Sequence, residues 1–183
     1  MADKLFYYSK SAHKLPGRGA NERVANEAEY KQLALIKDWR KMLSNFHVAP
    51  FELDGHTWAS VEHYYHSRKF IKNNPKFAYM FAIESGSVFC LDPVKAKSAG
   101  GKTGIVREAK VIIYKRSKEI VADNNFFGES VQNAAFMDAM LAKFSQHDDL
   151  KHVLLATGSA ELWHGARGPP ARIWPLESVR AML

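Results

Sequence analysis

The sequence is short of cysteine and of long apolar stretches, and each shortage excludes a class of protein. Its 183 residues include one cysteine, Cys90, so neither an intramolecular disulfide nor a cysteine-based zinc site can form. The longest apolar stretch on an expected helix, residues 77–83, is far below the roughly 20 residues that a membrane-spanning helix needs. The first 14 residues lack the apolar core of a secretory signal. We therefore expect an intracellular protein, in the cytoplasm or nucleus, with no membrane partner.

Repeats, low-complexity tracts and long linkers are also lacking. Hydrophobic residues make up 46% of the chain and charged residues 25%, a balance that excludes a disordered, collagen-like or coiled-coil protein. No segment rich in proline, glycine and serine is long enough to divide the chain. We expect a single domain over residues 1–183, with a predominantly helical α+β fold and a small β component.

Acidic residues are fewer than basic ones, and the excess is local. The chain has 26 Lys and Arg against 19 Asp and Glu, a net charge of +7, which indicates an anionic partner. Residues 95–118 hold eight basic residues and one acidic residue, and therefore account for the whole excess. Such a surface can hold a nucleic-acid strand by its phosphates without reading sequence. Gly101 and Lys102 lie within it, in a phosphate-contacting loop or a flexible linker.

Turn residues, caps and apolar periodicity predict the order of the elements. The expected order begins with a strand over 4–9, a loop to 25, and a helix that is capped by Asn26 and runs to about Leu43. A hairpin over 51–58 with its turn at Asp54-Gly55 follows, then a helix capped by Ser60 to about Lys72, a helix over 75–84 and a loop with one short helical turn over 85–104. The segment over 107–121 is ambiguous between helix and strand, and helix is favoured. The remaining elements are helices over 129–144 and 149–156, the latter ended by Gly158, a strand over 161–164, an extended loop at Pro169-Pro170 and a final helix over 176–182.

Three ionisable residues share one stripe of the helix after the hairpin. Glu62, His66 and Lys69 stand at i, i+4 and i+7, within about 60° of one another. A carboxylate, an imidazole and an amine so placed suit acid/base and nucleophilic chemistry. The alternatives are a solvated helix face, with Glu62 acting only on the helix dipole, and a metal site at His63 and His66 near His56. The metal site is not expected, because His63 and His66 point about 300° apart.

Aromatic residues gather around this stripe. Most of them are expected in the core, whereas Trp58, just before the helix, could instead stack on a base or sugar. The group comprises Phe46, Phe51, Trp58, Tyr64 and Tyr65.

The chain resembles the NADAR or YbiA-like superfamily in several motifs that occur in the family's order. They are LSNF at 43–46, DGHTW at 54–58, SVEHYYHSRKF at 60–70, the helix over 137–158 and the following AEL at 160–162. The resemblance covers nearly the whole chain. It implies a compact, mostly helical α+β fold and cleavage of an N-glycosidic bond, without a cofactor. Some members remove ADP-ribose from guanine bases in nucleic acid, and others cleave early riboflavin-pathway intermediates at a ribosylamine bond.

The resemblance also assigns roles to the stripe. Lys69 corresponds to the family's nucleophilic lysine, which attacks an anomeric carbon and forms a Schiff base. Glu62 corresponds to the acid/base residue that shuttles protons. The resemblance assigns no role to His66, which lies between them and is expected to contact substrate and tune both. Asn45 resembles a substrate-contacting amide of the family, with helix capping as its alternative role. Phe46 and Trp58 are predicted to bind substrate together with it.

The loop Pro16-Gly17-Arg18-Gly19, followed by Glu22, resembles the N-terminal loop of an ADP-ribose-handling subgroup. Glycines allow backbone N–H groups to approach phosphates, and Arg18 can pair with them. Gly17, Arg18, Gly19 and Glu22 are therefore candidate substrate-binding residues. The alternative is a surface loop.

The C-terminal region departs from many bacterial YbiA-like members. His164 stands where they carry a carboxylate, no acidic residue separates it from Trp174, and a tryptophan usual before the long helix is missing. These changes disfavour riboflavin-type activity. The segment resembles the viral and eukaryotic-like subgroup, in which His164 and Arg167 are expected to bind a pyrophosphate or position a base. A solvated charge is the alternative for Arg167.

We expect a hydrolase that removes ADP-ribose from guanine in DNA or RNA, with no obligate protein partner. The alternatives are an N-glycosidase of riboflavin-pathway ribosylamino-pyrimidines, a non-catalytic ADP-ribose binding module and a plain basic nucleic-acid-binding protein. The presence of both Glu62 and Lys69 argues against a binding module, which needs neither.

Overall fold

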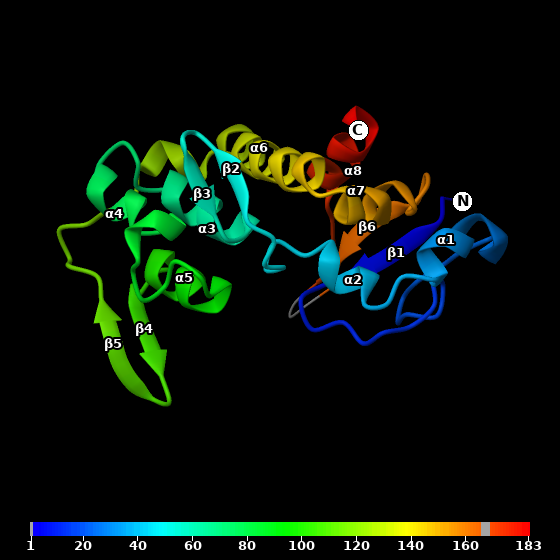
Figure 1. The fold of residues 1–183 in the computed structure, drawn as a ribbon, viewed down its shortest axis with the longest axis horizontal. Coiled ribbons are helices and arrows are strands. Elements are labelled where there is room, and N and C mark those ends of the chain that lie inside the picture. The colour runs from blue at the N-terminus through cyan, green and yellow to red at the C-terminus, as the bar shows by residue number, and fades with distance from the viewer. Residues whose placement is uncertain (1, 166–168) are drawn as a thin grey trace. The chain divides into compact units, whose positions relative to one another are not determined.

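The computed structural model describes residues 2–165 and 169–183, and its architecture is α+β and predominantly helical, as the sequence predicts (Figure 1). The chain forms two compact units. The terminal unit comprises residues 1–47 and 144–183, and the central unit comprises residues 48–143. The single domain expected over residues 1–183 remains a prediction. Within the described residues, no helix has the length and apolar character needed to cross a membrane.

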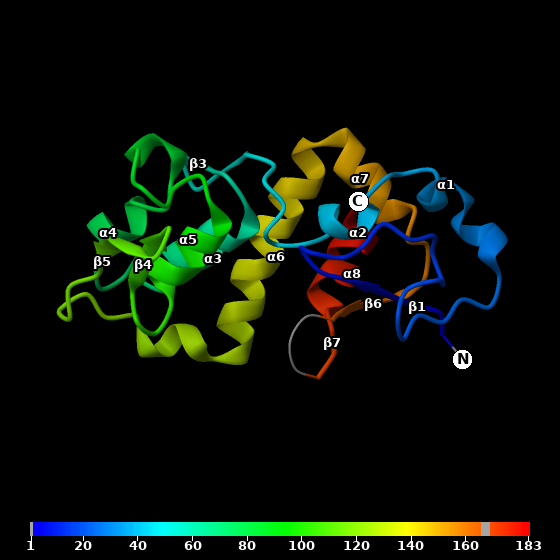
Figure 2. The same cartoon turned by 90° about the horizontal axis from the view of Figure 1, so that it is seen from below.

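The terminal unit is built on a three-stranded sheet. Strand β1 (Lys4–Tyr7) pairs in parallel with β6 (Glu161–His164), which pairs antiparallel with β7 (Ala171–Arg172) (Figure 2). Leu5 and Leu162 are register partners and are both fully buried, so the apolar positions of the two strands form the core. Helices α7 (Asp148–Leu155) and α8 (Trp174–Met182) belong to the same unit. The predicted strands at 4–9 and 161–164 and the last two helices are confirmed.

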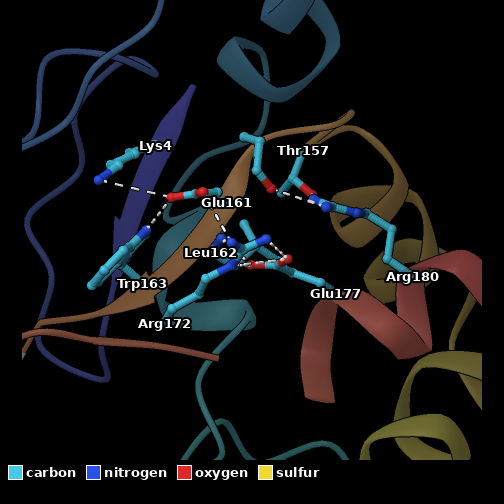
Figure 3. Close-up of polar contacts among 9 residues, drawn as sticks. Lys4, Thr157, Glu161, Leu162, Trp163, Arg172, Glu177 and Arg180 are labelled. Carbon is cyan, nitrogen blue, oxygen red and sulfur yellow. Dashed lines mark hydrogen bonds and ion pairs between the residues drawn. The ribbon is translucent and has the colours of Figure 1, made fainter. Parts of the chain in front are cut away.

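A charged network ties α8 to the sheet (Figure 3). Arg172 donates to both carboxylate oxygens of Glu177 and to Glu161. Glu177 also accepts from the backbone N–H of Leu162 at 2.9 Å. Arg180 donates to the Thr157 hydroxyl at 2.7 Å and to the Ala160 carbonyl at 2.9 Å. Because Glu177 holds the Leu162 N–H of β6 and Arg180 holds the Ala160 carbonyl just before it, two side chains of α8 fix the position of this strand.

The helix predicted from Asn26 to Leu43 is broken. The Asn26 cap is confirmed, but it begins a 3-10 turn, η1 (Glu27–Tyr30), followed by the one-turn helices α1 (Lys31–Ala34) and α2 (Trp39–Met42). Asp38 has φ +57°, which no α-helix can include. The register after the break buries Arg40 against Glu22, at 2.7 Å between Nη2 and Oε2. A tertiary ion pair therefore overrides the local helical preference.

The central unit begins with the predicted hairpin. Strands β2 (Phe51–Leu53) and β3 (His56–Trp58) are antiparallel, and Asp54 and Gly55 both have positive φ, as a two-residue primed turn requires. The helix after the hairpin is α3 (Val61–Arg68), which ends earlier than the predicted Lys72. In place of one helix over 75–84, the chain forms α4 (Pro75–Tyr79) and the 3-10 turn η2 (Ile83–Ser85). The helices that follow are α5 (Pro93–Gly100), the 3-10 turn η3 (Asn124–Phe127) and α6 (Glu129–Gln146), whose residues belong to both units.

The helix favoured over residues 107–121 is wrong, because this segment completes a second hairpin. Strands β4 (Ile105–Glu108) and β5 (Val111–Lys115) are antiparallel, and Figure 1 shows them extending away from α3, α4 and α5. The β-branched run from Val111 favours strand. The turn residues Ala109 and Lys110 both have positive φ, a conformation that asparagine and glycine usually mark. Without that marker, the sequence carries no turn signal.

The loop expected over residues 85–104 contains a full helix, α5. Asp92 caps it by accepting from the backbone N–H groups of Val94 and Lys95, and Pro93 occupies its first turn. Ala96, Ala99 and Gly100 are fully or nearly fully buried, and α5 packs on α3. The small residues that suggested a loop are therefore the close-packing face of a helix.

An aromatic cluster holds the C-terminal end of α3. Phe70 contacts Phe77 edge-on at 4.8 Å between ring centroids, and Phe81 lies 4.9 Å from Phe89. Tyr114 of β5 meets Phe89 at 5.2 Å. Each such pair adds about 0.5–1.5 kcal/mol beyond its buried area. Lys69, next to Phe70, is thus presented by a rigid part of the core.

Candidate active site

The predicted ionisable stripe lies on α3 and is buried. The exposed fractions of Glu62, His66 and Lys69 are 7%, 3% and 8%, so the alternative of a solvated helix face is wrong. Ser60 precedes the helix in extended conformation but does not cap it. Its hydroxyl instead pairs with His63 Nδ1 at 2.8 Å. Ionisable groups without water need partners, and the stripe supplies them internally.

The three side chains form one hydrogen-bonded chain. His66 Nε2 lies 3.1 Å from Glu62 Oε1, and His66 Nδ1 lies 3.0 Å from Lys69 Nζ. The imidazole thus joins the carboxylate to the amine. Helical spacing predicts His66 between the other two, and the expected role for it is to contact substrate and to tune both. In the structure both of its ring nitrogens face protein groups.

Neighbouring groups fix the His66 ring in place. The ring stacks on Phe81, with centroids 6.2 Å apart and planes at 18°, and meets Tyr65 edge-on at 5.4 Å. On another side it touches the backbone of Gly100, where an added Cβ would lie 2.2 Å from Nδ1. Gly100 therefore has to be glycine for the imidazole to sit there. Sequence reasoning missed this residue, because a Gly-Gly pair after a lysine-rich stretch resembles a linker.

Burial shifts the protonation of the amine. It lowers the pKa of Lys69 to about 8, with smaller lowering by Arg116 and Lys97 and an opposing effect of Glu62. Lys69 Nζ also lies 4.6 Å from the centre of the Tyr65 ring. At pH 7 about a tenth of such lysines carries a free amine, far more than for an exposed lysine. The site therefore holds a nucleophile near neutral pH.

The imidazoles are held neutral. Burial, followed by the charge of Lys69, lowers the pKa of His66 below its ordinary value despite the hydrogen bond with Glu62. Burial lowers the pKa of His63 to about 4. The Nε2 atom of His63 faces the Phe89 carbonyl at 3.1 Å, so both ring nitrogens of His63 are engaged within the fold. Within residues 2–165 and 169–183, no group of three or more His, Cys, Asp or Glu side chains is arranged to hold a metal ion.

Arg116 is a further residue beside the site that the sequence did not single out. Its guanidinium donates to the Ala99 carbonyl at 2.7 Å and lies 5.0 Å from the Phe70 ring centre. It thereby joins the residue that follows β5 to the end of α5, and its charge acts on Lys69. Because Arg116 is one of eight basic residues in the segment, nothing in the sequence indicates that its side chain holds the fold.

Trp58 is buried, with 3% of its surface exposed, and its indole N–H donates to the Leu53 carbonyl at 2.9 Å. Its ring meets Tyr64 edge-on at 5.4 Å. It also forms part of the lining of a cavity of about 500 Å³, together with Arg68 of α3. Trp58 is therefore a core residue that also borders a cavity, and its contact with substrate stays a prediction.

The N-terminal loop is organised by Glu22 of the terminal unit. Its carboxylate accepts from the backbone N–H groups of Phe6 and Gly19 and from Arg40. Gly19 has no room for a side chain, since an added Cβ would lie 2.6 Å from the Glu22 carboxyl carbon. Gly17 has φ +81°, and Arg18 pairs with Glu27 at 2.6 Å on the surface.

A cavity of about 380 Å³ borders this loop. Gly19 and Arg40 are among its lining residues. Glu22 thus shapes the loop, Gly19 borders the cavity, and their contact with substrate stays a prediction.

The other predicted substrate-binding residues fall on both units. Asn45 and Phe46 form a half-buried turn after α2, in the terminal unit. His164 ends β6, with its ring 5.8 Å from Tyr7. Gly101 and the exposed Lys102 follow α5 in the central unit. Arg167 lies outside the described residues.

The family model of the NADAR domain matches residues 36–177, which include the whole stripe. The chain belongs to the NADAR domain family. Two relatives are 32% identical to it over 119 residues: the N-glycosidase YbiA of Escherichia coli strain K12 and its counterpart in Shigella flexneri serotype 5b. The match covers 65% of this chain and 59% of each relative, so the alignment spans about three-fifths of their length.

A solved structure supports the NADAR fold. The NMR structure of the E. coli protein YbiA superposes with a TM-score of 0.55, covering 78% of this chain and 77% of that one. The aligned residues are 24% identical, so this likeness concerns the fold alone. It agrees with the α+β architecture that the sequence predicts.

Proposed function

We propose that this NADAR protein is an N-glycosidase that removes ADP-ribose from guanine bases in nucleic acid through a Schiff base on Lys69. The observation that carries the proposal is the buried chain of Glu62, His66 and Lys69, which presents an amine of lowered pKa beside an acid/base pair. Membership of a family whose matched relatives are named N-glycosidases agrees with it.

The substrate shares its reactive feature with riboflavin-pathway intermediates: a ribose whose anomeric carbon carries an exocyclic amine. When the bond from this carbon to the ring oxygen breaks, the oxygen gains a proton and an imine forms at carbon 1. The Lys69 amine adds to that carbon. The guanine amine then leaves with a proton, and a Schiff base to Lys69 remains. Water adds to the same carbon, the C–N bond to Lys69 breaks, and the free sugar is released. One water is consumed overall.

Two features favour a modified nucleic acid over a small metabolite. The first is the basic excess of residues 95–118, which suits a polyanion. The second is His164 at the position where many bacterial YbiA-like members carry a carboxylate. A riboflavin-pathway intermediate is the second candidate substrate, because its ribosylamine bond would be opened by the same chemistry.

One assay separates the candidates. The protein is incubated with an oligonucleotide ADP-ribosylated on guanine, with free ADP-ribose and with a ribosylamino-pyrimidine. We expect release of the unmodified oligonucleotide and of ADP-ribose. Cleavage of the pyrimidine alone would favour the second candidate. Binding of ADP-ribose without any turnover would indicate a binding module and contradict the proposal.

The proposed docking surface for the strand centres on the second hairpin. Its tip, residues 107–112, is exposed throughout and includes Arg107 and Lys110, and Lys115 is exposed at the far end of β5. Lys95 instead pairs with Glu108 at 2.7 Å. The basic segment therefore divides into side chains that hold the fold and side chains that project from it.

Replacing Lys110 and Lys115 together by Ala is expected to weaken oligonucleotide binding and to lower the slope of log affinity against log salt by about 2, since each phosphate contact contributes about one unit. Cleavage of ADP-ribosylated guanosine, which has no strand, should be unchanged. Fluorescence anisotropy over a salt series measures the slope. Lys76→Ala, an exposed lysine on α4, is the matched control. An unchanged slope in the double variant would exclude the hairpin as the docking surface.

A further inference from the structure

The contacts of His66 leave neither ring nitrogen available for a simple contact with substrate, which indicates another role for this residue. Both of its ring nitrogens are occupied by protein groups, one by a carboxylate and the other by an amine, at 3.1 and 3.0 Å. The ring is 3% exposed and clamped between Phe81 and the backbone of Gly100. A clamped imidazole between a carboxylate and a nucleophile is the arrangement that moves protons in hydrolases with an acid–histidine–nucleophile triad.

The partners decide which nitrogen carries the proton. A neutral imidazole donates from one nitrogen and accepts at the other. An ionised Glu62 can only accept, so Nε2 carries the hydrogen that points at Oε1. Nδ1 then has a lone pair directed at Lys69, whose ammonium can only donate. The competing tautomer would place the hydrogen on Nδ1, toward the Gly100 backbone, and would leave Nε2 and Glu62 as two facing acceptors. The first tautomer satisfies both side-chain contacts, with Glu62 and with Lys69.

We propose that His66 is the proton acceptor of Lys69, and that Glu62 fixes the tautomer and pairs with the imidazolium that forms. The inference rests on the proposed function for its role in turnover. A proton moves from Lys69 Nζ to His66 Nδ1, leaving a neutral amine with a free lone pair and an imidazolium hydrogen-bonded to Glu62. After the amine has added to carbon 1, the same proton passes from Nδ1 to the departing guanine amine. The residue is restored without any co-reactant.

The groups around the pair are consistent with this transfer. From α3, Glu62 and the ring of Tyr65 face the imidazole and the amine. From α5, Lys97 acts on Lys69, and from the end of β5, Arg116 does so too. Two cations near Lys69 disfavour its ammonium form, whereas the carboxylate lies on the far side of the imidazole and favours a proton there. The proton rests on Lys69, whose pKa stays above that of His66, and the imidazolium forms only during the transfer.

The first test uses substrate-free protein. Nitrogen-15 NMR of the imidazole at pH 7 is expected to show His66 protonated at Nε2 and bare at Nδ1. A protonated Nδ1 in the neutral ring would overturn the inference. This measurement needs no turnover, so its result does not depend on the proposed function. The proposed function is contradicted separately, if the wild-type protein cleaves none of the candidate substrates.

The second test is the pH profile of His66→Asn. The Asn amide oxygen can still accept from Lys69 near the Nδ1 position, but it cannot take the proton or reach Glu62. We expect kcat to fall about 10²–10⁴-fold. In the wild type, kcat should stay level down to the lowered pKa of His66, below pH 6.5, because the relay supplies the amine. In the variant, kcat should rise about tenfold per pH unit up to the pKa of Lys69 near 8. A lower rate with the wild-type profile would reduce His66 to a packing role and overturn the inference.

A third variant moves the imidazole without removing it. Gly100→Ala forces the ring away from its partners, since the new Cβ would lie 2.2 Å from Nδ1. We expect the same change of pH profile as in His66→Asn. Gly128→Ala is the matched control, because its Cβ would meet Asn125 O at an ordinary 3.5 Å. If Gly100→Ala folds, shifts the His66 resonances and keeps the wild-type profile, the relay is excluded.

Discussion

Replacing Lys69 by Ala is expected to abolish release of ADP-ribose from a modified oligonucleotide, by about 10⁴-fold or more, because the variant has no amine to form the Schiff base. Lys69→Arg should be equally inactive, since a guanidinium keeps the charge but stays protonated. The test compares single-turnover rates of the wild type and the two variants at pH 8, where the wild-type amine is about half deprotonated.

The loss should be chemical and not structural. Burial lowers the pKa of Lys69, which means that folding disfavours its ammonium form, so removing the amine relieves a cost. Thermal unfolding of Lys69→Ala should therefore resemble that of the wild type. Lys72→Ala is the matched control, because Lys72 is an exposed lysine three residues further on, where it pairs with Asp123 at 3.7 Å. Lys72→Ala should keep full turnover.

Borohydride trapping locates the nucleophile independently of rates. Reduction during turnover should fix ribose on Lys69 of the wild type and on no residue of Lys69→Ala, as mass spectrometry of peptides would show. Lys143 is a second buried lysine, and burial lowers its pKa to about 7. An adduct on Lys143, or full activity in Lys69→Ala, would contradict the assignment of Lys69.

Local rules predict those parts of the fold in which a few neighbouring residues decide the backbone. Asp54-Gly55 fixes a two-residue turn by itself, and Asn26 caps the turn that follows it. The second hairpin escapes such rules, because its positive-φ turn at Ala109 and Lys110 depends on packing of the strands it joins. Tyr114 in that hairpin contacts two phenylalanines that are far away in the sequence, Phe77 and Phe89.

The same distinction applies to the candidate site. Helical periodicity places Glu62, His66 and Lys69 on one stripe, and the structure keeps them there. Periodicity says nothing about what covers a stripe, so a solvated face is excluded only by tertiary packing, such as that of α5 and Phe81 on α3. The contact of Gly100 with the imidazole joins two elements and has no local signal. Burial, which turns three charged residues into a reactive group, is a property of the tertiary fold.

Glu62→Gln separates the supply of nucleophile from the handling of protons. The amide keeps the shape of the side chain and an oxygen that accepts from His66 Nε2, now 3.1 Å from Oε1, but it carries no charge. Because the charge of Glu62 raises the pKa of Lys69, its removal should lower that pKa further below about 8. More of the lysine is then present as free amine at pH 7.

Turnover should nevertheless fall about 10²–10⁴-fold, because the variant neither stabilises a protonated imidazole nor exchanges protons during ring opening. NMR titration of the Lys69 side chain and kcat measured on the same samples give the two quantities. Glu119→Gln, an exposed carboxylate in the same unit, is the matched control and should change neither. Turnover of Glu62→Gln as fast as that of the wild type would remove Glu62 from the chemistry. A rise in the Lys69 pKa would show that the carboxylate does not act on the amine through its charge.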